Sequence, residues 1–439
     1  DIKAFINNEA FKYNKSNDPR IYSNTMKSNK EISTFEKSVF TFCKFREGEK
    51  CPPWTLQASK MTHDSKKKTI YYDNAVVKIY DIPIFYFPYL AHPDPSVDRR
   101  SGLLIPSFTN SKNLGNGMSI PYFFNLGADK NFTLNSRLYF DQHPLFVGEY
   151  HQAFKNSSFI ADFGYTEGYK KTSSAKKAGD KSHLFFKFVK DFMGPSGSEN
   201  SLVINSQNVS NKKYLKLYKI QSNLVNHNVD HLENSFSFSH SKDDLFFNIS
   251  TNVFENLKDN VDDDYEFIVP KILLDKNLIR SKKFGNIDLE TKFTSTNYDT
   301  NKKITQLINT FDLESNRYIF NSKIKNNFLA KIKNFNYDAN NVEIYRDKKS
   351  SELFGAIGLL SEIDFMKRKN STTHLLTPKL LLRFAPSEMR KQIDGSRLSV
   401  IDAFSMDRVD EEENFETGNT ATLGLDFDIK KDNVDKFNF

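Results

Sequence analysis

From residue 103 onward, apolar and polar residues alternate with a period of two in one segment after another. Successive side chains of a β-strand point to opposite faces, so each alternating run predicts a strand with one apolar face and one polar face. Many such runs follow in series, with no helical pattern between them. The clearest runs are 132–141, 184–191, 235–239, 287–293 and 422–429.

The number of these runs favours a membrane β-barrel over a β-sandwich, although both folds give the same local pattern. At about 20–24 residues per strand and turn, residues 101–439 have room for roughly 14–16 strands. The mean hydropathy of −0.58 and the 27% of charged residues exclude a helical membrane protein. A barrel tolerates such polarity because half of each strand faces water. Residues 1–42 also form short strands, and we assign them to the end of an antiparallel β domain.

The composition and the motifs exclude several classes of function. The formal charge of +7 comes from 62 basic and 55 acidic residues dispersed along the chain, so no nucleic-acid partner is predicted. No nucleophile elbow or phosphate-binding glycine loop occurs, and His227 and His231 have no third metal ligand nearby in sequence. We therefore predict neither an enzyme, a cofactor nor a metal. The acidic segments 259–266 and 410–416 are interpreted as solvated loop tips.

An uncharged apolar run at 82–90 follows these first strands. A membrane-spanning helix needs about 18–20 apolar residues, which is twice this length. Pro83 and Pro88 also argue against a helix, because proline lacks the backbone N–H and clashes with the preceding turn. The run is predicted to be extended and packed on an apolar surface, with an edge strand of a soluble core as the alternative.

A proline-rich joint at 91–102 connects the apolar run to the alternating region. Its X-Pro pairs and its glycine favour extended and turn conformations. Arg99 and Arg100 are adjacent and would point to opposite faces of a strand. One of them could bind a phosphate or a lipid head group, or both could lie in a solvated turn.

Two prolines end neighbouring strands of a predicted hairpin. Pro106 ends the run 103–106, Pro121 ends the run 118–121, and a Gly- and Asn-rich turn lies between them. Proline cannot donate a ladder hydrogen bond, so both residues weaken the pairing at this point. In a soluble sheet they would blunt an edge, and in a closed barrel they would make one seam easier to open.

The two cysteines, Cys43 and Cys51, are close enough in sequence to bond to each other. A disulfide there would contribute about 2–3 kcal/mol by loop entropy, while a single Cys-x7-Cys pair is a poor zinc site. Trp54 follows two prolines and is interpreted as packing either at a domain junction or in an ordinary core.

Several segments, in order, resemble one known family. The similarity is to the lipopolysaccharide-assembly outer-membrane protein LptD, also called the organic solvent tolerance protein family. It rests on CPPW (51–54), DNAVVKIYDIPIFYFPYL (73–90), DRRSGLLIP (98–106), IPYFFNL (120–126) and DRVDEEENFETGNTATLGLDF (407–427).

The resemblance implies an all-β protein of the cell outer membrane. Residues 1–92 would be the C-terminal part of a periplasmic β-jellyroll domain, and residues 93–439 an incomplete antiparallel transmembrane β-barrel. The chain would lack part of the N-terminal domain and the C-terminal part of the barrel. The protein would receive lipopolysaccharide through the jellyroll groove and release it sideways into the outer leaflet. Its partners would be lipopolysaccharide, membrane lipids, an LptE-like lipoprotein plug inside the barrel and an LptA-like periplasmic bridge.

The resemblance also implies roles for single residues. Pro106 and Pro121 match the prolines of the lateral gate in the family. A cysteine matching Cys43 is bonded in relatives to one near the far end of the barrel, and this chain has no cysteine after Cys51. The domain junction would include Trp54, Pro83, Pro88, Arg99 and Arg100. A porin-like channel or another outer-membrane transporter is the alternative function.

Overall fold

The predicted all-β fold is confirmed by a computed structural model. It describes residues 20–29, 31–41, 54–79, 81–94, 97, 99–171, 178–259, 261–320, 323–343, 345, 347–369, 372–386, 388, 400–409, 411–431 and 434–438. Helices among these residues are limited to the 3-10 turn η2 (Pro195–Gly197) and the short helix α2 (Tyr214–Tyr218). None of the helices in the described part of the chain is long and apolar enough to cross a membrane.

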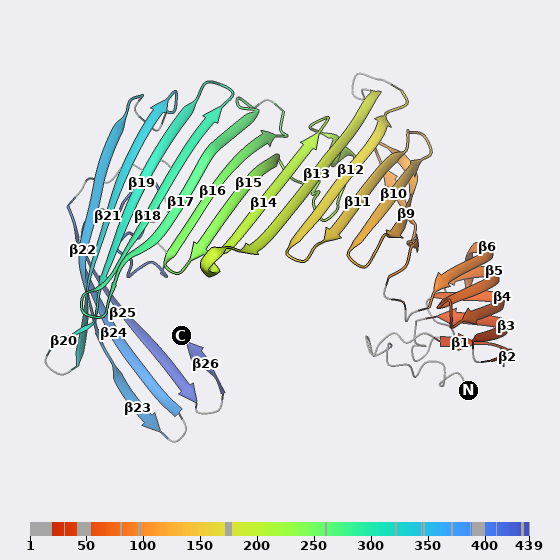
Figure 1. The fold of residues 1–439 in the computed structure, drawn as a ribbon, viewed down its shortest axis with the longest axis horizontal. Helices are drawn as coiled ribbons and strands as arrows, with labels where there is room; N and C mark the ends of the chain where they lie inside the picture. The colour runs from red at the N-terminus through yellow and green to blue at the C-terminus, as the bar shows by residue number, and fades with distance from the viewer. Residues whose placement is uncertain are drawn as a thin grey trace. The chain divides into compact units, whose positions relative to one another are not determined.

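The chain divides into two compact units. The first unit comprises residues 1–110 and 116–138, and the second comprises residues 111–115 and 139–439. Both units are drawn in Figure 1.

The first unit contains a six-stranded antiparallel sheet in the order β1-β3-β4-β5-β6, with β2 paired to β3. One face of this small sheet buries a core around Phe35, Met61 and Tyr72, each fully buried. The edge strand β6 exposes both of its faces, including Ile82, Phe85 and other apolar side chains. The strands are β1 (Arg20–Tyr22), β2 (Thr25–Ser28), β3 (Ile32–Thr41), β4 (Trp54–Asp64), β5 (Thr69–Ile79) and β6 (Ile82–Pro93).

An irregularity crosses the small sheet and explains where one proline is tolerated. The regular pairing omits Lys37 in β3, Ser59 in β4, Asn74 in β5 and Pro88 in β6. Lys37 and Asn74 have φ of 48° and 49°, a left-handed conformation that Asn adopts more easily than most residues. Pro88 therefore lies where the ladder is already interrupted, so its missing N–H breaks no regular rung.

The rest of the first unit is a ribbon of short and long strands. β7 (Gly102–Leu103) and β8 (Ser107–Ser111) both neighbour β9 (Gly115–Asn125), and β10 (Lys130–Tyr139) follows β9. The Ser119 hydroxyl of β9 donates to Asn135 Oδ1 of β10 at 2.6 Å. Phe124 and Phe132 stack across the same two strands with ring centroids 5.6 Å apart.

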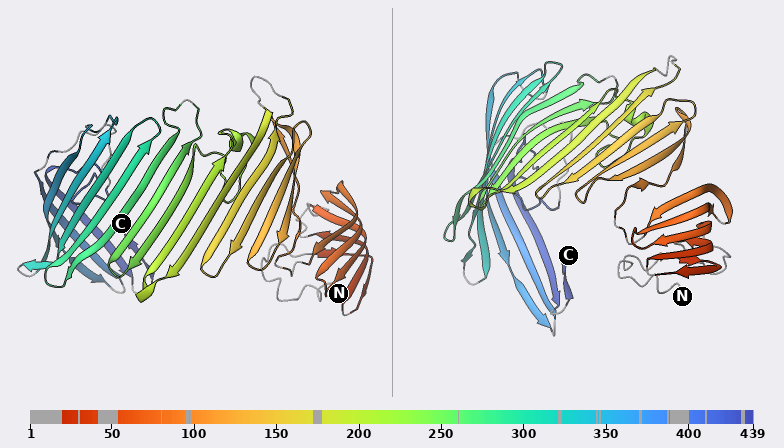
Figure 2. Two further views of the ribbon diagram at one scale, coloured as in Figure 1. Left: turned by 45° about the horizontal axis from the view of Figure 1, so that its top comes forward. Right: turned by 45° about the vertical axis from the view of Figure 1, so that its right-hand side comes forward.

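The second unit is one large, strongly curved antiparallel sheet in which sequential strands pair, as Figures 1 and 2 show. β20 is a short piece beside β21, and β23 is a short piece beside β24. The strands are β11 (Leu145–Ala153), β12 (Ser157–Gly168), β13 (Ala178–Met193), β14 (Glu199–Val209), β15 (His231–Lys242), β16 (Leu245–Asn256), β17 (Tyr265–Ser281), β18 (Gly285–Tyr298), β19 (Lys303–Ser315), β20 (Tyr318–Phe320), β21 (Ile324–Asn340), β22 (Ser350–Ile363), β23 (Phe365–Lys369), β24 (Thr372–Ala385), β25 (Gly418–Lys431) and β26 (Val434–Asn438).

The register gives this large sheet two faces of different character. We define the inner face as the one that carries Val147, His183 and Lys333, and the outer face as its opposite. Across the middle strands the inner face is polar, with serines of β15 beside serines and asparagines of β16. The outer face exposes large apolar side chains along its whole extent, including Leu184, Phe236, Phe311, Leu382 and Leu423. The predicted alternation is thus present in the strands.

Two connections fold onto the inner face and give it two apolar clusters. The first, residues 210–230, includes α2 and buries Tyr214, Leu215 and Tyr218 against β11–β16. The second, residues 400–417, buries Met406 and Phe415 against β19–β24. We refer to these as the 210–230 segment and the 400–417 segment.

Candidate functional site

The two sequence-predicted gate prolines lie at the pairing of β7 and β8 with β9. Leu103 pairs with Tyr122, and the Leu104 N–H donates to the Pro121 carbonyl at 2.9 Å. In an antiparallel ladder such a pair normally exchanges two hydrogen bonds. Pro121 has no N–H to return to Leu104, so this position has half of its hydrogen bonds.

Pro106 lies in the interruption between β7 and β8 and is exposed. It belongs to neither strand, and the pairs of β7 with β9 end before it. Pro106 has no N–H to offer a partner, so both prolines lack a donor in the region where β7 and β8 meet β9.

The adjacent arginines point to different partners, as expected for neighbours in an extended chain. Arg99 Nη1 donates to the Ala128 carbonyl at 3.2 Å, and its guanidinium lies 5.9 Å from the centre of the Phe123 ring. Arg100 Nη1 donates to the Thr69 hydroxyl and, at 3.4 Å, to the Lys67 carbonyl. One arginine thus contacts the β9–β10 end of the ribbon and the other contacts the β4–β5 turn of the small sheet.

The remaining sequence-predicted junction residues lie in the small sheet. Trp54 begins β4, is half-buried, and packs on Phe40 with ring centroids 6.4 Å apart. Its carbonyl accepts from the Thr41 hydroxyl at 2.7 Å. Pro83 pairs with Lys78 beside a register shift in β5–β6. Cys43 and Cys51 lie outside the described residues, so the disulfide stays a prediction.

A buried Tyr–His pair joins β5 to the end of β6. Tyr72 donates its hydroxyl to His92 Nε2 at 2.6 Å, and His92 Nδ1 donates to the Pro93 carbonyl at 2.7 Å. This arrangement uses the neutral imidazole, since one ring nitrogen accepts and the other donates. Burial lowers the pKa of His92, against smaller opposing effects of the Pro93 carbonyl and Asp94. Burial also raises the pKa of the Tyr72 hydroxyl.

Acidification should therefore weaken the small sheet. Because the pKa of His92 is below its ordinary value of 6.5, the unfolded chain binds a proton more readily than the folded one. The resulting stability is complete above about pH 6.5 and is lost as the pH falls through that value toward the lower folded pKa. Trp54 is the single tryptophan, so its fluorescence during urea unfolding at pH 7.5 and pH 5 reports the loss. A His92→Gln variant should lose most of this pH dependence; an unchanged dependence would assign it to another group.

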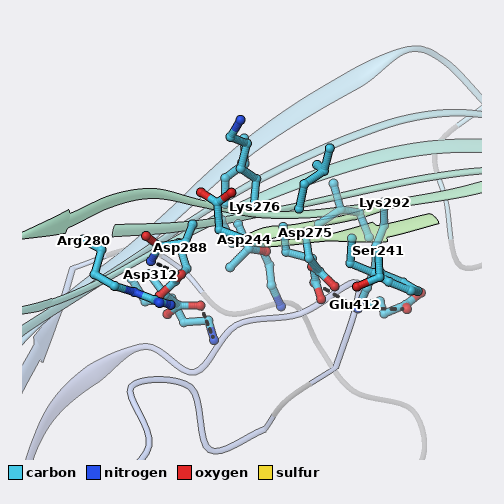
Figure 3. A pocket seen from close by; sticks show the side chains of 18 of the residues that line it. Ser241, Asp244, Asp275, Lys276, Arg280, Asp288, Lys292, Asp312 and Glu412 are labelled. Carbon is cyan, nitrogen blue, oxygen red and sulfur yellow. Dashed lines mark hydrogen bonds and ion pairs between the residues drawn. The ribbon is translucent and has the colours of Figure 1, made fainter. Parts of the chain in front are cut away.

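The inner face of the large sheet carries a polar groove of about 630 Å³. Eight carboxylates and five cations line it, from the β15–β16 turn, β17, β18, β19, β21 and the 400–417 segment. Asp275, Lys292 and Glu412 lie close together there (Figure 3), and Lys292 Nζ is 3.1 Å from Glu290 and 3.5 Å from Glu412. Such a lining of hydrogen-bonding groups fits hydroxylated or charged ligands. Within the described residues no cluster of three His, Cys, Asp or Glu side chains suits a metal ion.

Two buried cations hold the 400–417 segment beside this groove. Lys333 Nζ donates to the carbonyls of Glu411 at 2.6 Å and Asn414 at 2.9 Å, and it lies 3.3 Å from the Asp407 carboxylate. Arg383 donates to the Met406 carbonyl at 2.7 Å and to the Glu416 carbonyl.

The interpretation of residues 410–416 as a solvated loop tip is wrong for the end of that segment. Asn414, Phe415 and Glu416 are buried, and Phe415 stacks on Phe354 with ring centroids 6.0 Å apart. The acidic composition suggested a solvated loop, but the segment is held through its backbone carbonyls and the ring of Phe415. A phenylalanine in the middle of an acidic run was the available signal.

Comparison with known proteins gives one consistent result. No family model matches the chain. It is 39% identical to the LPS-assembly protein LptD of Methylococcus capsulatus over 106 residues, which are 23% of this chain and 10% of that protein. It is 31% identical over 112 residues to LptD of Nitrosococcus oceani, and 32% identical over 117 residues to LptD of Aeromonas hydrophila.

These alignments cover 26% of this chain in both of the latter cases, and 14% and 13% of the two relatives. The matched region thus spans about a tenth to a seventh of the length of these relatives. Within that region, the chain is similar to the LPS-assembly protein LptD.

Proposed function

We propose that this chain takes part in lipopolysaccharide assembly at the outer membrane, as a lateral-release translocon. The similarity to LptD supports this, and so does the large sheet with its exposed apolar outer face and polar inner face. Residues 1–92 would form the end of a periplasmic jellyroll that receives the acyl chains, and residues 93–439 would form the membrane barrel. Lipopolysaccharide, an LptE-like plug and an LptA-like bridge are the proposed partners. The role requires no catalysis.

The single observation that carries this proposal is the missing donor at Leu104–Pro121, beside the interruption between β7 and β8 that contains Pro106. A seam through which a lipid leaves must open without breaking a full ladder. Each missing backbone bond reduces the cost of opening by about 1 kcal/mol, the net value of a typical hydrogen bond. The missing donor of Pro121 and the interruption at Pro106 would thus ease opening locally and leave the rest of the pairing unchanged.

Replacing both prolines by alanine in the full-length protein should slow export. Each restored donor stabilises the closed seam by up to about 1 kcal/mol, so two of them correspond to roughly a thirtyfold lower opening rate when the bonds break before the barrier. Surface lipopolysaccharide, measured by pulse labelling, checks the result. Pro378→Ala is the matched control, because Pro378 also lies inside a strand, β24, but away from β7–β9. Equal export in the double variant and the wild type would refute lateral release through these residues.

An outer-membrane channel is the second candidate, and the polar groove on the inner face favours it. A channel would show steady ion conductance after reconstitution into planar bilayers, and that conductance would be indifferent to Pro106 and Pro121. The 210–230 and 400–417 segments, which pack on the same inner face, argue for a closed resting state instead.

A further inference from the structure

The short connections of the large sheet differ in character from the long ones. Because sequential strands alternate in direction, the connections β17–β18 and β19–β21 and the short strand β23, which lies between β22 and β24, are at one end of the sheet. The connections that contain the 210–230 and 400–417 segments leave β14 and β24 at the other end. In outer-membrane barrels the short turns face the periplasm and the long loops face outward. β20 and β23 mark this short-turn end at the lower left of Figure 1.

Three neighbouring short connections carry exposed cations. We call Lys282, Lys283, Arg317, Lys367 and Arg368 the basic rim; all five are exposed. The first two connections touch directly, since Asn316 Nδ2 donates to the Ser281 carbonyl at 3.0 Å. The third is tied to β21 through an ion pair between Lys325 and Asp364.

An exposed aromatic ring accompanies the cations at each of these connections. Phe284 is 67% exposed, Phe365 is 53% exposed and Tyr318 is 39% exposed. Lys283 Nζ lies 5.2 Å from the centre of the Phe284 ring. Aromatic rings next to snorkelling Lys or Arg are typical of a membrane interface, where the ring enters the acyl region and the cation reaches the phosphate.

The rim also continues the apolar outer face. Phe365 pairs with Leu376, and Leu376 pairs with Phe427, so these three side chains share one face. Leu423 and Leu425 lie on that face further along β25 and are exposed. The next pair toward the tip is Lys367 with His374. Apolar side chains thus give way to basic ones along the same face, which is the order found from acyl chains to head groups.

We propose that the basic rim is a binding surface for anionic phospholipid head groups of the leaflet that faces the short turns. The inference rests on the proposed placement in the outer membrane, and it adds a lipid preference that lipopolysaccharide export does not require. Arg317 of the rim is ion-paired with Glu362 at 3.6 Å, and Asp364 is ion-paired with Lys325. The other four rim cations keep an excess of positive charge, which gives the charge complementarity. The exposed aromatic rings and the apolar outer face favour a membrane over a soluble acidic partner, because they can insert among acyl chains.

The test compares lipid binding to the full-length protein in vesicles of phosphatidylcholine with and without phosphatidylglycerol. The bound lipids are counted by native mass spectrometry after extraction. The rim variant is Lys282→Gln, Lys283→Gln, Lys367→Gln and Arg368→Gln. The matched control removes four exposed lysines at the long-loop end, with Lys170→Gln, Lys171→Gln, Lys348→Gln and Lys349→Gln.

The wild type and the control should retain phosphatidylglycerol in preference to phosphatidylcholine, and the rim variant should lose that preference by tenfold or more. This follows because each Lys or Arg near an anionic surface strengthens association by about fivefold. Equal loss in both variants, or no loss in the rim variant, would overturn the proposal while the protein still inserts. Failure of the wild type to insert, seen as flotation without protease protection, would overturn the membrane placement and the rim together.

Discussion

Phe415→Ala should release the 400–417 segment from the inner face of the large sheet. Phe415 is fully buried and stacks on Phe354. The guanidinium of Arg383 lies over its ring, 5.7 Å from the ring centre. Truncating a buried phenylalanine costs about 3–5 kcal/mol, through lost burial and the cavity that remains. The four hydrogen bonds of Lys333 and Arg383 to carbonyls of the segment remain, at about 1.5–3 kcal/mol for each charged bond. The release is therefore a shift of the opening equilibrium by about 3–5 kcal/mol.

Limited proteolysis in detergent measures the release, with cleavage within 400–417 mapped by mass spectrometry. The variant should be cut there at least a hundredfold faster than the wild type, since 3 kcal/mol is more than two factors of ten. Val400→Ala is the control in the same segment, because Val400 is exposed. Equal cleavage of Phe415→Ala and the wild type would show that the segment is held by its polar contacts alone.

His183→Ala should destabilise the other end of the large sheet by a similar amount. His183 Nε2 lies 2.5 Å from the Asp162 carboxylate, and both side chains are completely buried. Asp162 Oδ2 has no hydrogen-bond partner among the described residues, so removing the imidazole takes away the hydrogen bond that His183 makes to this carboxylate. Breaking a buried pair from one side costs about 3–5 kcal/mol, because the remaining group stays desolvated. Thermal unfolding in detergent should show a clear fall in Tm.

Two further variants separate this mechanism from simple loss of packing. His143 pairs with Glu167 at 3.2 Å on the surface, so His143→Ala should change stability by less than about 1 kcal/mol. The double variant Asp162→Leu with His183→Phe should be close to the wild type, because an apolar pair removes the uncompensated carboxylate. A double variant as unstable as His183→Ala would point instead to the packing of Tyr214, whose hydroxyl lies 3.3 Å from His183 Nδ1.

The strands could be predicted from the sequence because their cause is local. Alternation in a run such as 235–239 needs only the period of the chain and one polar face. The prolines are local too, since Pro106 and Pro121 lack a donor in any environment. Which hydrogen bond of the ladder a proline removes depends on the strand register, and the structure shows this register at Leu104–Pro121.

The buried polar groups could not be predicted because their partners are distant in sequence. Asp162 and His183 meet only when β12 and β13 take their register. Gly164 is part of the same site, since a Cβ there would lie 2.5 Å from the His183 ring. In the sequence, Lys333 and Arg383 look like ordinary cations of a strand. Their burial could not be predicted, because it depends on the 400–417 segment, whose carbonyls they bind. No period or motif in residues 210–230 distinguishes an infolded segment from a solvated loop.

The anchoring of the 400–417 segment has a consequence for the order in which the protein assembles. Gln306 of β19 donates at 3.1 Å to Glu413, which lies 107 positions later in the sequence. Lys333 of β21 and Arg383 of β24 donate to the same segment. Contacts between residues so far apart form slowly, since the loop must close before the contact is gained. We therefore expect the segment to dock after β19, β21 and β24 have paired, so that the polar groove on the inner face stays open until a late step of folding.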